Sequence, residues 1–321
     1  MVAIRLSIAA LAISLLCAPV FADPTSKTIP SVAAGLTSVT TSDGVLLKAD
    51  IAGKGMPCLF VHGGPGSGSE VVEKLAGKTL ESHFQMIYLD QRGSGRSASD
   101  PKNDYSLDRV VQDMEELRAR LQIKQWVLMS HSFGGIIATA YAKKYPEHVN
   151  GIVLINSILN LPASMESTTM HGYALLPAGK PPMDPAAPLP QRFGMVMAML
   201  GQSGLSSKLV YAKDGTDARV KESLKGLQSN NSFTSSVFQS GAIATYVDDM
   251  TPATAALTMP VLVISGKEDH MVGVDHYKSF RFPHQQVVLV PGRHFAMIEQ
   301  PEETGQALAQ FAETLQKQAV K

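Results

Sequence analysis

The chain has 321 residues, of which 45% are hydrophobic and 17% are charged, and its formal net charge is +0. This composition is typical of a folded globular protein and excludes a disordered chain. The balanced charge and the lack of a long basic run argue against nucleic acid or an anionic membrane as the main partner.

The first 22 residues have the pattern of a secretory signal peptide. Arg5 precedes an apolar stretch that ends near Cys17, and Val20 and Ala22 are small residues placed as at a signal-peptidase site. The apolar stretch is shorter than the ~20 residues of a spanning helix, so a retained anchor is the weaker alternative. We expect cleavage after Ala22 and a periplasmic or secreted protein that makes no membrane contact afterwards.

The two cysteines are Cys17 and Cys58. If Cys17 leaves with the signal peptide, Cys58 has no partner, and the exported protein must fold without a disulfide. Cys58 lies in the apolar run "PCLFVHGG", which predicts a buried structural thiol.

Short runs rich in Val, Ile and Leu, each bounded by Gly, Pro or Asp, predict the strands. The first two flank "SDG" and indicate a hairpin. The later runs lack alternation, as strands buried on both faces of a parallel sheet do. The runs cover residues 36–41, 45–51, 58–62, 85–90, 126–130, 151–156, 261–266 and 286–292.

Helical periods lie between these runs. Apolar spacing predicts a helix over about 107–121, with Ser106 placed to cap it, a second helix after Gly134 and a last one from Pro301. Alternating strands and helices behind a hairpin predict an α/β fold with a mostly parallel, doubly wound sheet and an antiparallel edge.

The alternation breaks between about Leu159 and Met259. The proline-rich run "LLPAGKPPMDPAAPLPQ" cannot continue a helix or a central strand. We therefore predict an inserted, largely helical cap over 159–259, which divides the core into residues 23–158 and 260–321. The Met-rich stretch from Met195 to Met199 either packs the cap on the core or forms an apolar wall beside the substrate.

The stretch "WVLMSHSFGG" carries the candidate nucleophile. A sharp strand-to-helix turn lifts one side chain above a sheet when the residues two before and two after it are small. Only Ser132 meets this condition, with Ser130 before it and Gly134 after it. We predict that Ser132 is the nucleophile, that Ser130 has a packing role, and that His131 points away from Ser132 and is not its base.

The base and the acid are predicted from chain order. In this topology the serine is followed by the acid and then by the histidine, each on a loop after a strand. Asp269 follows the strand predicted over 261–266, and His294 follows the next one. His294 is the candidate base and Asp269 the acid that orients it, with Glu268 as the alternative acid.

The glycine-rich stretch "FVHGGPGSGSE" follows an early strand and allows backbone N–H groups to approach a substrate. We expect the N–H groups of Gly64 and Phe133 to form the oxyanion hole. His62 precedes the glycines, and we expect it to shape the loop.

Across the length expected for the mature protein, these residues make the chain resemble the α/β-hydrolase superfamily. "HGGPGSG" and "YLDQRGSGRS" together resemble the proline iminopeptidase branch, which cleaves N-terminal residues from peptides and carries a helical cap. The resemblance implies a triad of Ser132, Asp269 and His294.

Two features bear on the substrate that this resemblance implies. Proline iminopeptidases usually have "GGSWG" at the nucleophile turn, whereas this chain has "SHSFGG", which is common among esterases. They also use cap carboxylates to hold the substrate amine. The carboxylates available for that role here are Glu166, Glu222, Asp248 and Asp249.

Two other classes of function fit the sequence less well. "GSGRSA" at 93–98 matches a dinucleotide-binding pattern, but a polar loop with Pro101 follows it, and the next helix is predicted only from about Leu107. A non-catalytic binding protein of this fold would have lost its triad, and all three members are present. No Cys or His spacing suggests a metal site.

The sequence thus predicts an exported serine hydrolase without a cofactor. It would cleave an ester or amide bond of a small ester or short peptide through an acyl-enzyme on the serine. A proline iminopeptidase-like aminopeptidase and a carboxylesterase or lactonase are the open alternatives.

Overall fold

The computed structural model describes residues 32–319, so the expected signal peptide and Cys17 lie outside the described residues. Eight strands form one sheet in the order β1-β2-β4-β3-β5-β6-β7-β8. β2 is antiparallel to β1 and β4, and the other neighbours are parallel, which confirms the predicted fold class. The strands are β1 (Gly35–Thr40), β2 (Leu46–Gly53), β3 (Pro57–Val61), β4 (Gln85–Asp90), β5 (Trp126–Ser132), β6 (Val149–Ser157), β7 (Val261–Gly266) and β8 (Gln285–Val290).

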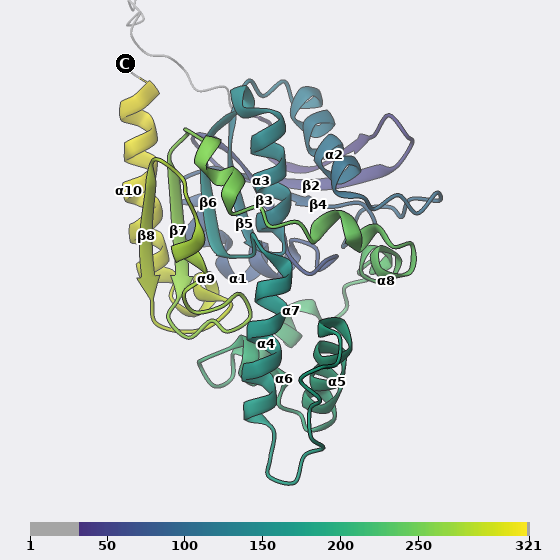
Figure 1. The fold of residues 1–321 in the computed structure, drawn as a ribbon. Helices are drawn as coiled ribbons and strands as arrows, with labels where there is room; N and C mark the ends of the chain where they lie inside the picture. The colour runs from purple at the N-terminus through teal and green to yellow at the C-terminus, as the bar shows by residue number, and fades with distance from the viewer. Residues whose placement is uncertain (1–31, 320–321) are drawn as a thin grey trace, which may run out of the picture.

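Helices cover both faces of the sheet (Figure 1). α2 (Leu107–Arg120) and α3 (Gly134–Lys144) pack on one face, and α1 (Glu70–Glu81), α9 (Ala296–Glu299) and α10 (Pro301–Ala319) pack on the other. The three predicted core helices are therefore present. Because both faces are covered, the central strands are sealed from water.

Three local details differ from the sequence predictions. α1 was not predicted, although Val72, Ala76 and Leu80 recur at a spacing of four and are buried. Ser106 precedes α2, but its hydroxyl donates to Asp104 and does not cap the helix. β8 was expected to be buried on both faces; it is the outer strand of the sheet and is partly exposed, as at Leu289. Cys58 is fully buried in β3, as expected.

The segment between β6 and β7 is mostly helical, and we refer to residues 159–259 as the cap. Its helices α4 to α7 extend beyond the carboxyl ends of the strands (Figure 1), and α8 packs against the short 3-10 helix Ala242–Tyr246, which also contacts α2. Met195, Met197 and Met199 pack against a small apolar core of the cap that includes Val196 and Leu200. The helices are α4 (Leu161–Leu175), α5 (Leu189–Gln202), α6 (Ser206–Val210), α7 (Thr216–Leu224) and α8 (Ser232–Gln239).

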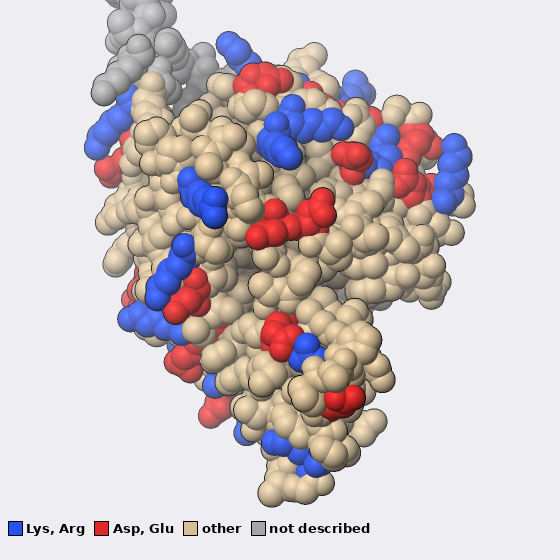
Figure 2. Space-filling view, in the orientation of Figure 1, with Lys and Arg blue, Asp and Glu red and all other residues tan. Residues whose placement is uncertain are grey.

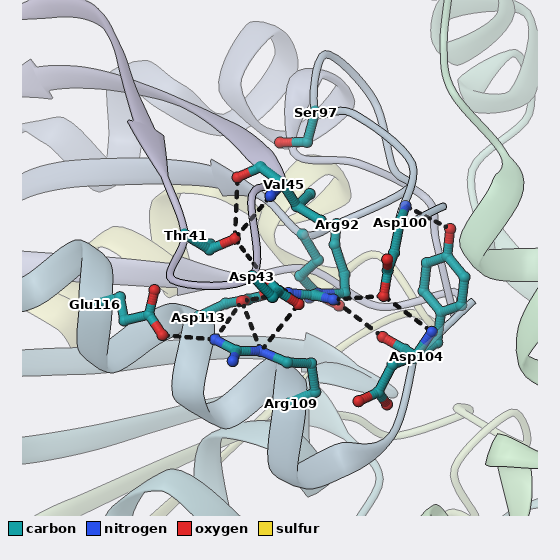
Figure 3. Close-up of polar contacts among 12 residues, drawn as sticks. Thr41, Asp43, Val45, Arg92, Ser97, Asp100, Asp104, Arg109, Asp113 and Glu116 are labelled. Atoms are coloured by element: carbon teal, nitrogen blue, oxygen red, sulfur yellow. Dashed lines mark hydrogen bonds and ion pairs between the residues drawn. The ribbon is translucent and has the colours of Figure 1, made fainter. Parts of the chain in front are cut away.

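A buried arginine joins three segments of the core (Figure 3). Arg92, in the turn after β4, forms ion pairs with Asp43 at 2.9 Å, Asp100 at 2.9 Å and Asp113 at 2.6 Å. Burial alone would lower the pKa of Arg92, but the pairs with Asp113 and Asp43 outweigh it and raise the pKa. The guanidinium therefore ties the β1–β2 turn and α2 to the turn after β4.

The glycines of this turn do not open a helix. Residues 91–106 form turns and loops, and α2 begins only at Leu107. A dinucleotide site needs a helix N-terminus directly after its glycines, so the geometry does not support that alternative.

Charges of both signs are scattered over the face of the molecule in Figure 2. Within residues 32–319, no helix combines the length and the apolar character that crossing a bilayer requires.

Candidate functional site

The turn after β5 has the geometry predicted for a nucleophile. β5 ends at Ser132 and α3 begins at Gly134, and Ser132 has a left-handed φ of 54°. A Cβ on Gly134 would lie 2.1 Å from the carbonyl oxygen of Val61, so only glycine fits there. Ser130 is fully buried and its hydroxyl bonds that of Ser157 at 2.9 Å, which agrees with a packing role.

A hydrogen-bonded chain links the three residues that the sequence singled out. His294 Nε2 lies 2.9 Å from Ser132 Oγ, and His294 Nδ1 lies 3.0 Å from Asp269 Oδ2. Ser132 ends β5, whereas Asp269 and His294 lie in the loops after β7 and β8, and all three side chains are buried. Glu268, the alternative acid, has a side chain that is 61% exposed and takes no part in these hydrogen bonds.

The carboxylate of Asp269 is held from both sides. The backbone N–H of Met271 donates to Oδ1 at 2.9 Å, and Asn156 Nδ2 donates to Oδ2 at 2.6 Å. Burial alone would raise the pKa of Asp269, but the charge and hydrogen bond of His294, together with the bond from Asn156, outweigh it and lower the pKa. Asp269 is therefore ionised at neutral pH and can accept a hydrogen bond from the Nδ1–H of His294.

His131 supports the histidine loop. Its ring packs against the ring of His294 with centroids 4.7 Å apart, and its Nε2 donates to the carbonyl oxygen of His294 at 2.8 Å. Burial, with the nearby His294, lowers the pKa of His131 to about 3, so the ring is neutral at physiological pH. As predicted, His131 does not face Ser132 as a base.

The glycine loop after β3 lies against the Ser132 turn. A Cβ on Gly63 would lie 2.7 Å from the Cβ of Ser132 and 3.2 Å from the backbone nitrogen of Phe133. Gly64 follows with a φ of 119° and lines the same cavity as Ser132. The two backbone groups proposed for an oxyanion hole, those of Gly64 and Phe133, thus belong to adjacent segments next to the serine.

His62 shapes the glycine loop, as expected. Its Nε2 accepts the backbone N–H of Gln91 at 3.0 Å, and the side chain of Gln91 donates to the carbonyl oxygen of His62 at 2.9 Å. These bonds join the loop to the end of β4, and they engage the imidazole nitrogen that a base would need.

A cavity of about 200 Å³ opens beside Ser132. No Asp, Glu, Lys or Arg is among the described residues that line it. The cap contributes Val210 to the lining, and the Met195–Met199 stretch does not reach it. The other apolar side chains in the lining are Phe60, Val72, Met271 and Phe295.

The cap carboxylates singled out from the sequence lie elsewhere. Glu166 forms a two-bond ion pair with Arg192 at 2.7 and 2.9 Å, and Glu222 is paired with Lys225 at 3.6 Å. Asp249 lines a separate cavity of about 430 Å³, and Asp248 is exposed. Within residues 32–319, no three His, Cys, Asp or Glu side chains are grouped to hold a metal ion.

Hydrogen bonds join the cap directly to the two loops that carry Asp269 and His294. Ser167 of α4 donates to the carbonyl oxygen of His270 at 2.9 Å. The N–H of His294 donates to the carbonyl oxygen of Val210, at the end of α6, at 3.0 Å. The position of the cap is therefore coupled to the geometry of the site.

The matching family model describes the α/β-hydrolase fold and covers residues 57–301. The chain belongs to this family. Among curated relatives, the proline iminopeptidase of Neisseria meningitidis is 36% identical over 110 residues, which cover 34% of this chain and 35% of that protein. That of Saccharolobus solfataricus is 32% identical over 120 residues, covering 36% of this chain and 38% of that protein. The chain thus spans about a third of the length of these relatives.

Solved structures resemble nearly the whole described chain. A proline iminopeptidase-related protein of Thermus thermophilus has a TM-score of 0.69 at 22% identity, covering 87% of this chain and 97% of that one. A thermophilic esterase of Thermogutta terrifontis has a TM-score of 0.65 at 22% identity, covering 88% and 99%. At this identity the likeness establishes the shared fold.

Proposed function

We propose that the chain is a serine hydrolase with a catalytic triad of Ser132, His294 and Asp269. The observation that carries this proposal is the unbroken path from Ser132 Oγ through the His294 ring to Asp269 Oδ2, with separations of 2.9 and 3.0 Å. Both lie within the reach that proton transfer and imidazole orientation require.

In the proposed reaction, Ser132 Oγ attacks a carbonyl carbon while His294 Nε2 takes its proton. The negative charge on the carbonyl oxygen is stabilised by the N–H groups of Gly64 and Phe133. The imidazolium, stabilised by Asp269, then gives its proton to the leaving alcohol or amine. A water molecule deprotonated by His294 cleaves the acyl-enzyme and restores the serine.

A fluorophosphonate probe tests this assignment, because it reacts with serines activated by a base. The wild type should be labelled and Ser132→Ala should not. Ser130→Ala is the matched control: it removes a buried hydroxyl two residues away and should keep the label. Labelling of Ser132→Ala at the wild-type rate would refute the nucleophile assignment.

The cavity lining favours a small uncharged acyl group. A substrate with a free amine needs a carboxylate to pair its charge, and none of the described residues that line the cavity carries one. We propose a carboxylesterase-like activity, with small esters preferred and lactones included. A proline iminopeptidase-like aminopeptidase is the second candidate, supported by the relatives of that name that are 36% and 32% identical to part of this chain.

Matched substrate pairs separate the two candidates. Prolyl p-nitroanilide and its cyclopentanecarbonyl analogue differ in the ring amine, and alanyl and propanoyl p-nitrophenyl esters differ in the α-amine. An esterase should show equal or higher kcat/KM for the uncharged member of each pair. An aminopeptidase should lose at least about 100-fold when the amine is removed, because its carboxylate is left unpaired.

We also propose that the protein acts outside the cytoplasm after loss of residues 1–22, on the basis of the charge and apolar pattern of that segment. The intact mass of the protein purified from a periplasmic or culture fraction tests this. A mature chain that starts at Asp23 is expected, and an uncleaved chain retained in the cytoplasm would contradict the proposal.

A further inference from the structure

Asn156, near the end of β6, has an unusual backbone for its environment. The residue is fully buried and has a left-handed φ of 46°. Non-glycine residues rarely adopt this conformation, and asparagine is among the few that tolerate it. The left-handed turn places the Asn156 side chain among the loops that follow β7 and β8.

The amide of Asn156 contacts both of these loops. Its Nδ2 donates to Asp269 Oδ2 at 2.6 Å and to the carbonyl oxygen of Arg293 at 3.2 Å. Arg293 directly precedes His294, so one NH₂ group joins the acid loop to the histidine loop. The amide can face these neighbours only with its nitrogen, because both are acceptors.

This orientation leaves the other end of the amide unpaired. Asn156 Oδ1 is buried and has no hydrogen-bond partner among the described residues. Leaving a buried acceptor unpaired is unfavourable. The side chain therefore keeps its two donor bonds although its acceptor is left without one.

We infer that Asn156 is a positioning residue that fixes the rotation of the Asp269 carboxylate and the separation of the acid and histidine loops. Asp269 Oδ2 accepts from Asn156 Nδ2 as well as from His294 Nδ1. Without the amide, the carboxylate can rotate away from the imidazole. This inference rests on the triad of the proposed function and assigns Asn156 no contact with substrate.

The titratable and charged groups around Asn156 and Asp269 determine how strongly a carboxyl group introduced at position 156 interacts with its surroundings. The neighbouring imidazoles have pKa values that are lowered by burial, so they are neutral at physiological pH. Arg293 is the nearby permanent cation. The titratable and charged groups that face the pair are His131 from β5, His270 and His276 from the loop after β7, and Arg293 from the loop after β8.

The test measures the rate of fluorophosphonate labelling of Ser132 against pH, which requires no knowledge of the substrate. Asn156→Gly fits the left-handed backbone and removes the amide. Its maximal labelling rate should fall by about 10- to 100-fold, the scale of a small misplacement of reacting groups. Asn156→Asp keeps the shape but places a second carboxyl group within hydrogen-bond distance of Asp269 Oδ2, where the two cannot both be ionised. At neutral pH the protonated Asp donates to Asp269 in place of the amide, so labelling should be faster than in Asn156→Gly. The rate should fall again at higher pH, when that proton is lost.

Asn160→Gly is the matched control. Asn160 lies four residues further along, and its side chain caps α4 by accepting the N–H of Ala163 at 3.0 Å. This variant should have a lower melting temperature but the wild-type labelling rate at every pH. A purely structural role for Asn156 predicts the same behaviour for its own variants.

Different results would overturn the proposed function and the positioning role of Asn156. If folded Asn156→Gly and Asn156→Asp were both labelled at the wild-type rate at every pH, the inference about Asn156 would be overturned and the proposed function would stand. Loss of labelling explained by the unfolded fraction, measured by circular dichroism, would overturn it as well. If Asn156→Asp does not fold, the labelling rate of Asn156→Gly decides. Labelling that does not depend on Ser132 in the wild type would overturn the proposed function and this inference together.

Discussion

Asp269 and Glu268 are adjacent in the chain but differ in the two properties that an orienting acid needs. Asp269 is fully buried and bonded to His294 Nδ1, whereas the Glu268 side chain is 61% exposed and lies 3.9 Å from Arg293. A buried carboxylate is desolvated and fixed, so its interaction with an imidazolium is strong.

Asp269→Asn is therefore expected to fold normally and to lose roughly 10⁴ in kcat, because the amide stabilises the wrong imidazole tautomer. Glu268→Gln is the matched control and should keep the wild-type kcat. Steady-state kinetics on a small activated ester measures both. The reverse outcome, with Glu268→Gln impaired and Asp269→Asn active, would transfer the role of the acid to Glu268.

The sequence predicted the members of the candidate site that a local motif or the order of the chain reveals. The small residues around Ser132 are a local requirement of the turn and can be read in one stretch of chain. Asn156 could not be found in this way, because "GIVLIN" reads as an ordinary strand end. Its left-handed φ and its contact with Asp269, 113 residues away, exist only in the folded chain.

Among the elements, the turn after β4 is held in position by a network of buried ion pairs. Arg92 is fully buried and pairs with Asp43, Asp100 and Asp113, of which the last two are also buried. In such a network each charge is compensated only while its partners are present. The turn, the β1–β2 hairpin and α2 should therefore lose their mutual positions together when the guanidinium is removed.

We expect Arg92→Met to reduce the free energy of unfolding by about 3–5 kcal/mol, because it leaves buried carboxylates without a partner. Urea unfolding at pH 7 measures the change. Arg192→Met is the control, since it breaks a two-bond pair with the half-exposed Glu166, and only a small change is expected there. Equal losses in the two variants would show that burial of Arg92 is not the cause.

The strands were predicted more completely than the helices for a physical reason. Strands sealed on both faces need continuous apolar runs, which stand out in a sequence. α1 mixes buried Val72, Ala76 and Leu80 with charged residues and a glycine, so its pattern is weaker. The partial exposure of β8 depends on its place at the outside of the sheet, which its own residues do not encode.

Across the whole molecule, neutral histidines make stability sensitive to acid. Burial lowers the pKa of each of these rings, most strongly that of His131, to about 3. A histidine with a lowered pKa binds its proton in the unfolded chain first, so the folded state loses stability as pH falls below the unfolded value of about 6.5. Carboxylates with lowered pKa values, such as Asp269, reduce the free energy of unfolding only when the pH falls below about 4. The histidines concerned are His62, His83, His131, His171, His270 and His276.

The histidines should therefore contribute a fall in the free energy of unfolding between pH 7 and pH 5, and Glu73, whose pKa burial raises to about 7, acts in the opposite direction over the same interval. His131 alone accounts for about 2 kcal/mol of that fall, at roughly 1.4 kcal/mol per pH unit below 6.5. His131→Gln should show a fall that is smaller by this amount in urea unfolding at the two pH values. An identical fall in the wild type and the variant would mean that His131 is already protonated in the folded protein.

The junction between the cap and the histidine loop uses a main-chain acceptor on the cap side. The N–H of His294 donates to the carbonyl oxygen of Val210, a group that every amino acid provides. The side chain at position 210 lines the cavity beside Ser132 and is free to change without breaking this bond. Substrate preference can therefore drift through position 210 over evolution, or be redesigned there, while the histidine stays in register with the serine.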